Sequence, residues 1–188
     1  DAMITLQKLI QTLDAARQTY VHRSLSGGMS IVITGRGARI FGPFLADGTP
    51  LCWINPALAD GERFQAFIDA GDWNLGGERI WIAPEIQFNI PDRAHFWETH
   101  RVPPQMDPGV WTLVSDSEHV RLESEMSLAA FNLASGVLDM HAHHTITTLV
   151  PDPLRHTHQA ALSDGIACGG STRTLRLSIA APGSIECE

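Results

Sequence analysis

The sequence is poor in several features, and each shortage excludes a class of protein. Its 188 residues include only three cysteines, Cys52, Cys168 and Cys187, an odd number with wide spacing and no CxxC pair. That pattern is not a disulfide framework and fits a reducing compartment. No apolar run approaches the roughly 20 residues that a membrane-spanning helix needs. The start of the chain also lacks the basic region and apolar core of a signal peptide, so we expect a cytoplasmic protein without a membrane partner.

Basic side chains are also scarce, and nearly all of them are arginines. The chain carries 13 Lys+Arg, of which only Lys8 is a lysine, against 21 Asp+Glu, so its net charge is -8. The arginines are scattered, whereas phosphate binding needs a clustered basic surface, and we therefore expect no nucleic-acid partner. The 44% hydrophobic and 18% charged fractions are ordinary for a globular protein. The length suffices for one domain with a substantial core.

The residues that are present predict one helix followed by many strands. Residues 3–18, MITLQKLIQTLDAARQ, place apolar side chains at helical spacing, which predicts an amphipathic helix within an N-terminal segment 1–19. From residue 20 onwards, short segments rich in β-branched residues alternate with glycine, proline and aspartate turns. Residues 57–71 suggest a short helix and 151–165 a long loop. The segments predicted as strands are 20–25, 29–34, 38–45, 51–55, 78–83, 86–90, 110–116, 119–130, 137–150 and 172–181.

This strand rhythm predicts a mainly β fold, an antiparallel β-sandwich domain over residues 20–188. Residues 119–130 give the clearest pattern, because apolar and polar side chains alternate along them. Such alternation places one face of a strand in the core and the other in water.

The stretch WNLGGERIWIAPE, residues 73–85, is the first candidate for a functional site. If its centre is a strand, Arg79, Trp81 and Glu85 share one face. Tryptophan can stack on the apolar face of a sugar ring, while arginine and glutamate can hydrogen-bond its hydroxyls. The alternative is structural: Arg79 covers Trp81 in a cation–π contact, and Glu85 pairs with an arginine.

The motifs ARIFGPF, LCWINPAL, GDWNLGGERIWIAPE, VRLESEMSL and ITTLV together resemble the galactose-mutarotase-like superfamily. More narrowly, GGERIWIAPE resembles a GG[DE]R[IL]W[IL]xPE signature of bacterial aldose 1-epimerase-like proteins. The resemblance implies a β-supersandwich that binds a hexose-like sugar in a cleft on one sheet. It also implies that Arg79, Trp81 and Glu85 face this cleft, with Trp73 as a second stacking residue.

The same resemblance implies a reaction. Mutarotases interconvert anomers with a general acid, usually a histidine, and a general base, a glutamate late in the chain. His95 and Glu85 are the catalytic candidates here, although His95 also fits an ordinary loop histidine. Either Arg36 or Arg39, in the GRGAR turn, is a further candidate to reach the sugar.

The late glutamate of mutarotases has no counterpart in these 188 residues. The chain therefore fits part of a longer sandwich, or a non-catalytic sugar-binding or structural β-domain. An incomplete sandwich exposes sheet edges, which proteins usually cover or pair. We accordingly expect a homo-oligomer, or association with a second segment that completes the sandwich.

HAHH, residues 141–144, suggests a competing class of protein, a cupin-like metalloprotein. On a strand His141 and His143 share a face, which suits chelation of one metal ion. A cupin-like site also needs a glutamate three or four residues after the second histidine, and Ile146 and Thr147 occupy those positions. A second pair, the histidines of 156–158, has no clearer partner. We therefore predict no cofactor and no metal, and keep His141 with His143 as the alternative.

Overall fold

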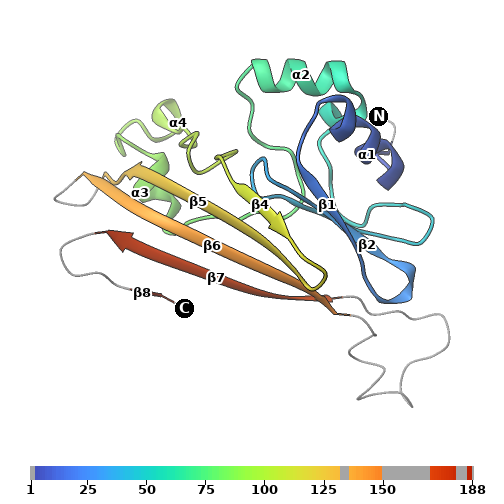
Figure 1. Ribbon diagram of the computed structural model, residues 1–188. Coiled ribbons are helices and arrows are strands. Elements are labelled where there is room, and N and C mark those ends of the chain that lie inside the picture. Colours follow the sequence, from blue (N-terminus) through green and yellow to red (C-terminus); the bar gives the residue numbers. More distant parts are fainter. Residues whose placement is uncertain (1–2, 132–135, 150–169, 181–185, 188) are drawn as a thin grey trace, which may run out of the picture.

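The computed structural model describes residues 3–131, 136–149, 170–180 and 186–187. Its strands form two antiparallel sheets, of three and five strands, which confirms a mainly β, sandwich-like fold with an N-terminal helix (Figure 1). The elements are, in chain order, α1 (Leu6–Ala15), β1 (Tyr20–Ser24), η1 (Ser26–Gly28), β2 (Ser30–Thr34), β3 (Ile40–Phe44), η2 (Pro56–Ala59), α2 (Gly61–Asp69), α3 (Glu85–Asn89), α4 (Phe96–Thr99), β4 (Thr112–Ser115), β5 (His119–Ala129), β6 (Val137–Leu149), β7 (Gly170–Ala180) and β8 (Glu186–Cys187).

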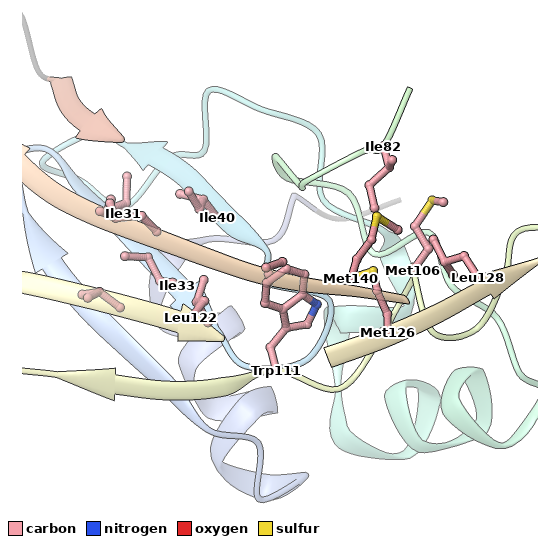
Figure 2. Packing of buried hydrophobic residues seen from close by; sticks show 14 of the residues in the cluster. Ile31, Ile33, Ile40, Ile82, Met106, Trp111, Leu122, Met126, Leu128 and Met140 are labelled. Atoms are coloured by element: carbon pink, nitrogen blue, oxygen red, sulfur yellow. The ribbon is translucent and has the colours of Figure 1, made fainter. Parts of the chain in front are cut away.

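The larger sheet has the strand order β4-β5-β6-β7-β8, and the smaller one β1-β2-β3. The two sheets pack face to face, and we call the apolar cluster between them the inter-sheet core (Figure 2). Ile31 and Ile33 of β2 enter this core from the smaller sheet, and Leu122 of β5 enters it from the larger one. Its other main members are Ile40, Ile82, Met106, Trp111, Met126, Leu128 and Met140.

The opposite face of the smaller sheet is covered by α1 and α2, which form a helix-side core with it (Figure 1). Helix α1 begins where the Thr5 hydroxyl accepts the Lys8 amide at 3.4 Å, an N-cap contact. Its residues Leu9 and Leu13, one turn apart, are buried against Val32 of β2 and its neighbours. Among the described residues, no helix is both long and apolar enough to cross a bilayer.

The alternation predicted for residues 119–130 is present in β5. Val120, Leu122 and Met126 are buried, whereas Arg121 and Glu125 are exposed on the other face. Strands β5 and β6 pair in register along the whole of β5, from the His119–Thr147 pair to the Ala129–Val137 pair. On the outward face of the larger sheet, the polar side chains of β5 therefore lie directly beside those of β6.

Three of the predicted strands are wrong. Residues 51–55 and 78–83 contribute only isolated bridges, Ile54 with Gly76 and Ile40 with Glu78. Residues 86–90 lie largely in the short helix α3 instead. In each case the residue types suit a strand, but the segment has no continuous partner strand, and a single sequence does not show whether one is present. The loop predicted at 151–165 lies outside the described residues, as do Cys168 and the histidines of 156–158.

Candidate functional site

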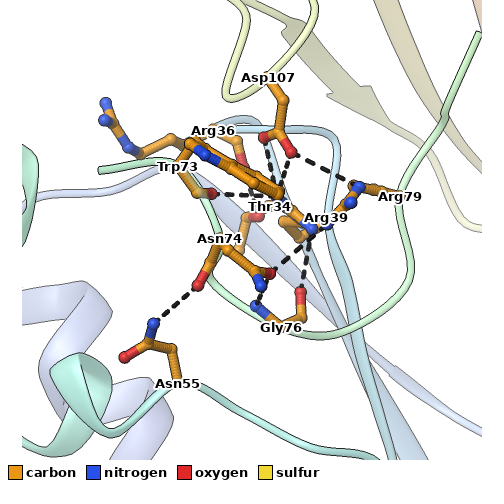
Figure 3. A network of polar contacts seen from close by, with 9 residues as sticks. All are labelled: Thr34, Arg36, Arg39, Asn55, Trp73, Asn74, Gly76, Arg79 and Asp107. Atoms are coloured by element: carbon orange, nitrogen blue, oxygen red, sulfur yellow. Dashed lines mark hydrogen bonds and ion pairs between the residues drawn. The ribbon is translucent and has the colours of Figure 1, made fainter. Parts of the chain in front are cut away.

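A fully buried ion pair anchors the candidate site (Figure 3). Arg39, which immediately precedes β3, donates from Nη2 to both carboxylate oxygens of Asp107, at 2.7 and 2.6 Å. The same guanidinium donates to the carbonyl oxygens of Trp73 (3.0 Å) and Gly76 (3.3 Å). Because its side chain is 0% exposed, Arg39 does not reach a ligand in solvent, contrary to one expectation from the sequence. Instead, it fixes the 73–76 loop to the fold.

Arg79 extends this network to the surface. Its Nε lies 3.5 Å from Oδ2 of Asp107, and its side chain is 25% exposed. The guanidinium carbon lies 4.0 Å from the ring centroid of Trp81 and 4.8 Å from that of Trp73. The two indole rings are 5.8 Å apart and tilted by 35°. We call Trp73, Arg79 and Trp81 the arginine–tryptophan cluster; Figure 3 shows two of its members, Trp73 and Arg79, beside Asp107.

A glycine turn brings the cluster together. Gly76 and Gly77 have φ of 80° and 66°, a region that L side chains rarely adopt. A Cβ on Gly77 would also lie 2.8 Å from the carbonyl oxygen of Ile40, so the backbones approach closely here. The Asn74 side-chain oxygen accepts the Gly76 amide (3.3 Å) and Nη1 of Arg79 (3.4 Å). The turn thus folds the chain back so that residue 79 lies beside residue 73.

The site carries more positive than negative charge. Arg36, Arg39 and Arg79 all act electrostatically on the single carboxylate of Asp107. Burial raises the pKa of the Asp107 carboxyl, and the three guanidiniums oppose that rise. Burial likewise lowers the pKa of the Arg39 guanidinium, and Asp107 opposes this. The buried Nε of Arg36 has no hydrogen-bond partner in the described part of the chain. Three cations around one anion favour a negatively charged ligand.

The remaining predicted residues lie on neighbouring short helices. Glu85 begins α3, and its Oε1 accepts a hydrogen bond from Asn89 at 3.1 Å and lies 3.7 Å from Nε2 of His100. His95, just before α4, hydrogen-bonds Asp92 through Nδ1 at 2.7 Å and is 61% exposed. The carboxylate of Glu85 therefore has an imidazole partner, but that partner is His100 rather than an arginine.

The structure thus unites Trp73, Arg79 and Trp81, and it also contains the cation–π contact of the alternative interpretation. Sequence reasoning misses Asp107, the residue that orients Arg79. Asp107 lies 68 positions from Arg39, and a single sequence holds no signal for such a long-range pair. Its neighbours in MDPG are typical of an ordinary turn.

A second polar group lies between the two sheets, beside a cavity of about 170 Å³. Glu78 forms an ion pair there with Arg173 of β7, and both side chains line the cavity. His144 of β6 is buried on the same inner face of the larger sheet. Burial lowers the pKa of His144 to about 4, with a further decrease from Arg173 and an opposing effect from Glu78.

The fold and the site define a mainly β protein with a partly exposed arginine–tryptophan cluster over a buried ion pair. Comparisons of the chain with family models, curated proteins and solved structures give no match. The function is therefore inferred from the chemistry of the cluster and from the motifs of residues 73–85.

Proposed function

We propose that the protein binds a hexose-like sugar at the arginine–tryptophan cluster, as a member of the galactose-mutarotase-like superfamily. The observation that carries the proposal is the position of the Arg79 guanidinium, held by Asp107 and Asn74 beside two indole rings. Donors fixed before binding lose little freedom when a ligand arrives. Aromatic faces next to such donors match the apolar face and the hydroxyl edge of a pyranose.

The positive charge around Asp107 favours a negatively charged sugar as the ligand. Three guanidiniums act on the one carboxylate of Asp107, and Arg79 is partly open to solvent. A carboxylate on the ligand would pair with Arg79 in a bidentate, charge-assisted contact. We therefore propose a preference for uronic acids over neutral hexoses.

The reaction we propose is the interconversion of anomers. One group protonates the ring oxygen while another removes the proton of the anomeric hydroxyl; the ring opens, closes on the other face, and the protons return. Glu85 is the carboxylate for this chemistry, and His95 the imidazole named from the sequence. His100 is a further imidazole for the same role, since it lies 3.7 Å from Glu85.

Sugar titrations test the proposal. Hexoses, pentoses and uronic acids are titrated into the protein, and binding is followed by intrinsic fluorescence and by calorimetry. We expect saturable binding, strongest for a uronic acid, that Trp81→Ala weakens by at least about tenfold, or about 1.4 kcal/mol. Polarimetry with the bound sugar then tests catalysis, and Glu85→Gln should slow mutarotation without abolishing binding.

Trp97→Ala is the matched control, because this tryptophan is 82% exposed and its ring contacts Phe96 and His100 instead of Arg79. It should bind sugar like the wild type. Loss of binding in Trp97→Ala but not in Trp81→Ala would place the ligand beside α4 without the arginine–tryptophan cluster and overturn the assignment. Binding without any mutarotation would leave a non-catalytic sugar-binding domain.

A further inference from the structure

The outward face of the larger sheet brings two histidines and a glutamate together. His141 and His143 lie two residues apart on β6, so they project from the same face, and Glu123 of β5 is paired directly with His143. The two imidazole rings are 4.3 Å apart, and Nδ1 of His143 lies 3.3 Å from Oε1 of Glu123. One potential ligand atom from each residue lies within 4.8 Å of the other two. We call these three residues the His–Glu group.

The spacing matches metal coordination. Zinc binds nitrogen and carboxylate oxygen at about 2.0–2.2 Å, so neighbouring ligand atoms in a tetrahedral site are roughly 3.3 Å apart. The His143–Glu123 pair already has this separation. The ligand atom of His141 lies within 4.8 Å of the other two, a distance that rotation of its side chain can shorten.

The scaffold beneath the group is rigid. Strands β5 and β6 are both interior strands of the five-stranded sheet and pair in register over the whole of β5 (Figure 1). Beneath the group, Leu122 and Ala142 are fully buried in the inter-sheet core. A backbone fixed on both sides holds the Cβ positions of the ligands, which is what a preorganised metal site requires.

Charge and exposure also suit a bound cation. Glu125 pairs with His141 on the same face and adds a second carboxylate beside the group, which offsets the positive charge of Arg176, the β7 residue in register with His143. The side chains of Glu123 and His143 are 45% and 44% exposed, so water can complete the coordination.

We propose that Glu123, His141 and His143 bind one divalent transition-metal ion, with water in the remaining positions. Imidazole and carboxylate ligands suit zinc and its neighbours in the first transition row, and three protein ligands with an open position form a zinc site of the accessible type. The carboxylate comes from the adjacent strand, which explains why the histidine-rich motif lacks the downstream glutamate of a cupin. The site is separate from the arginine–tryptophan cluster and does not depend on sugar binding.

Zinc binding to the chelator-treated protein tests this proposal. Calorimetric titration with Zn²⁺ at neutral pH should show one saturable equivalent. His143→Ala and Glu123→Gln should each weaken it by at least about tenfold, since even residues behind the direct ligands contribute 10–100-fold. His119→Ala is the matched control, because this histidine lies on β5 near Asp116 and opposite Thr147 and is not part of the group.

Titration with Co²⁺ adds a readout of geometry, because its visible absorption reports a site of low coordination number. The wild type should show this band, and the double variant His141→Ala/His143→Ala should lose it while its circular dichroism stays native. Glu123→Gln, nearly isosteric, decides the matter if the histidine variants fail to fold. No saturable Zn²⁺ binding by the wild type, or an equivalent retained in the double variant, would overturn the proposal.

Discussion

His144 is a buried titratable residue of the inter-sheet region. It lies on the inner face of β6, opposite Leu122 of β5, and is 6% exposed. Its Nδ1 has no hydrogen-bond partner among the described residues. Desolvation, reinforced by Arg173, lowers the pKa of this histidine from 6.5 to about 4. The folded protein therefore holds His144 neutral at pH values where the unfolded chain protonates it.

This difference predicts a loss of stability in acid. Between pH 6.5 and about 4 the unfolded state binds more protons at His144 than the native state, so stability falls as pH falls. The full effect is about 3 kcal/mol, from 1.36 kcal/mol per pKa unit. Urea denaturation at several pH values, for the wild type and His144→Gln, measures it. The stability difference between the two proteins should change across this window, and a difference that is constant with pH would contradict the prediction.

At the candidate site, the sequence identifies the residues of the cluster better than it identifies their partners. Trp73, Arg79 and Trp81 follow from residue types that suit a sugar and from the resemblance of their motif. Their partner Asp107 does not, because a buried ion pair between residues distant in sequence leaves no local pattern. For Glu85 the sequence predicts the wrong local structure. The expectation that Glu85 and Trp81 share a face requires a strand, whereas α3 begins at Glu85.

At the scale of elements, the turn at Gly76 and Gly77 decides where the cluster forms. The amide of Gly77 donates to the Trp53 carbonyl oxygen at 3.0 Å, and the next residue pairs with Ile40. The chain thus contacts the edge of β3 for one residue and then leaves it. Directly after this contact, the side chain of Arg79 points towards Asp107.

Gly77→Ala should therefore destabilise the fold more than a comparable glycine substitution elsewhere. A positive φ costs an L residue about 1–2 kcal/mol, and overpacking adds roughly 1–3 kcal/mol when a Cβ meets fixed backbone. Gly71→Ala is the matched control, since Gly71 has φ of 74° but a Cβ there would meet no atom within 4 Å beyond its chain neighbours. Chemical denaturation should show the larger loss for Gly77→Ala, and equal losses would mean that the close approach to Ile40 carries no cost.

The strands themselves are largely predictable, and the exceptions have two causes. The segments at β2 and β6 are rich in β-branched residues, β5 alternates apolar with polar side chains, and each pairs with a neighbouring strand along most of its length. Residues 78–83 have residue types that also suit a strand, but they pair only at Glu78. Residues 86–90 are too short for periodicity to separate a strand from the helical turns that form there.

At the scale of the whole molecule, β2 joins the two cores. All five of its residues are buried. Ile31 and Ile33 face the inter-sheet core, while Val32 faces the helix-side core. The smaller sheet is thus a shared middle layer between the helices and the larger sheet, so neither core can be lost without exposing one face of β2.

We therefore predict one cooperative unfolding transition. Leu13→Ala in the helix-side core and Leu122→Ala in the inter-sheet core should each cost about 2–5 kcal/mol. In both variants the midpoints from far-ultraviolet circular dichroism and from tryptophan fluorescence should coincide, because Trp111 is buried in the inter-sheet core. A Leu13→Ala variant whose helix signal is lost before its fluorescence changes would show that the two cores unfold independently.

The burial of β2 on both faces also has a consequence for the newly synthesised chain. Its sequence, SIVIT, has no charge and no proline and is rich in β-branched residues, the composition of segments that self-associate when exposed. Translation delivers α1 first, and α1 packs on one face of β2, whereas the strands that cover the other face follow about 90 residues later. Until the larger sheet has been synthesised, one side of β2 is exposed and can pair with other chains. The nascent chain is therefore most prone to aggregate in the time between synthesis of the smaller sheet and synthesis of the larger one.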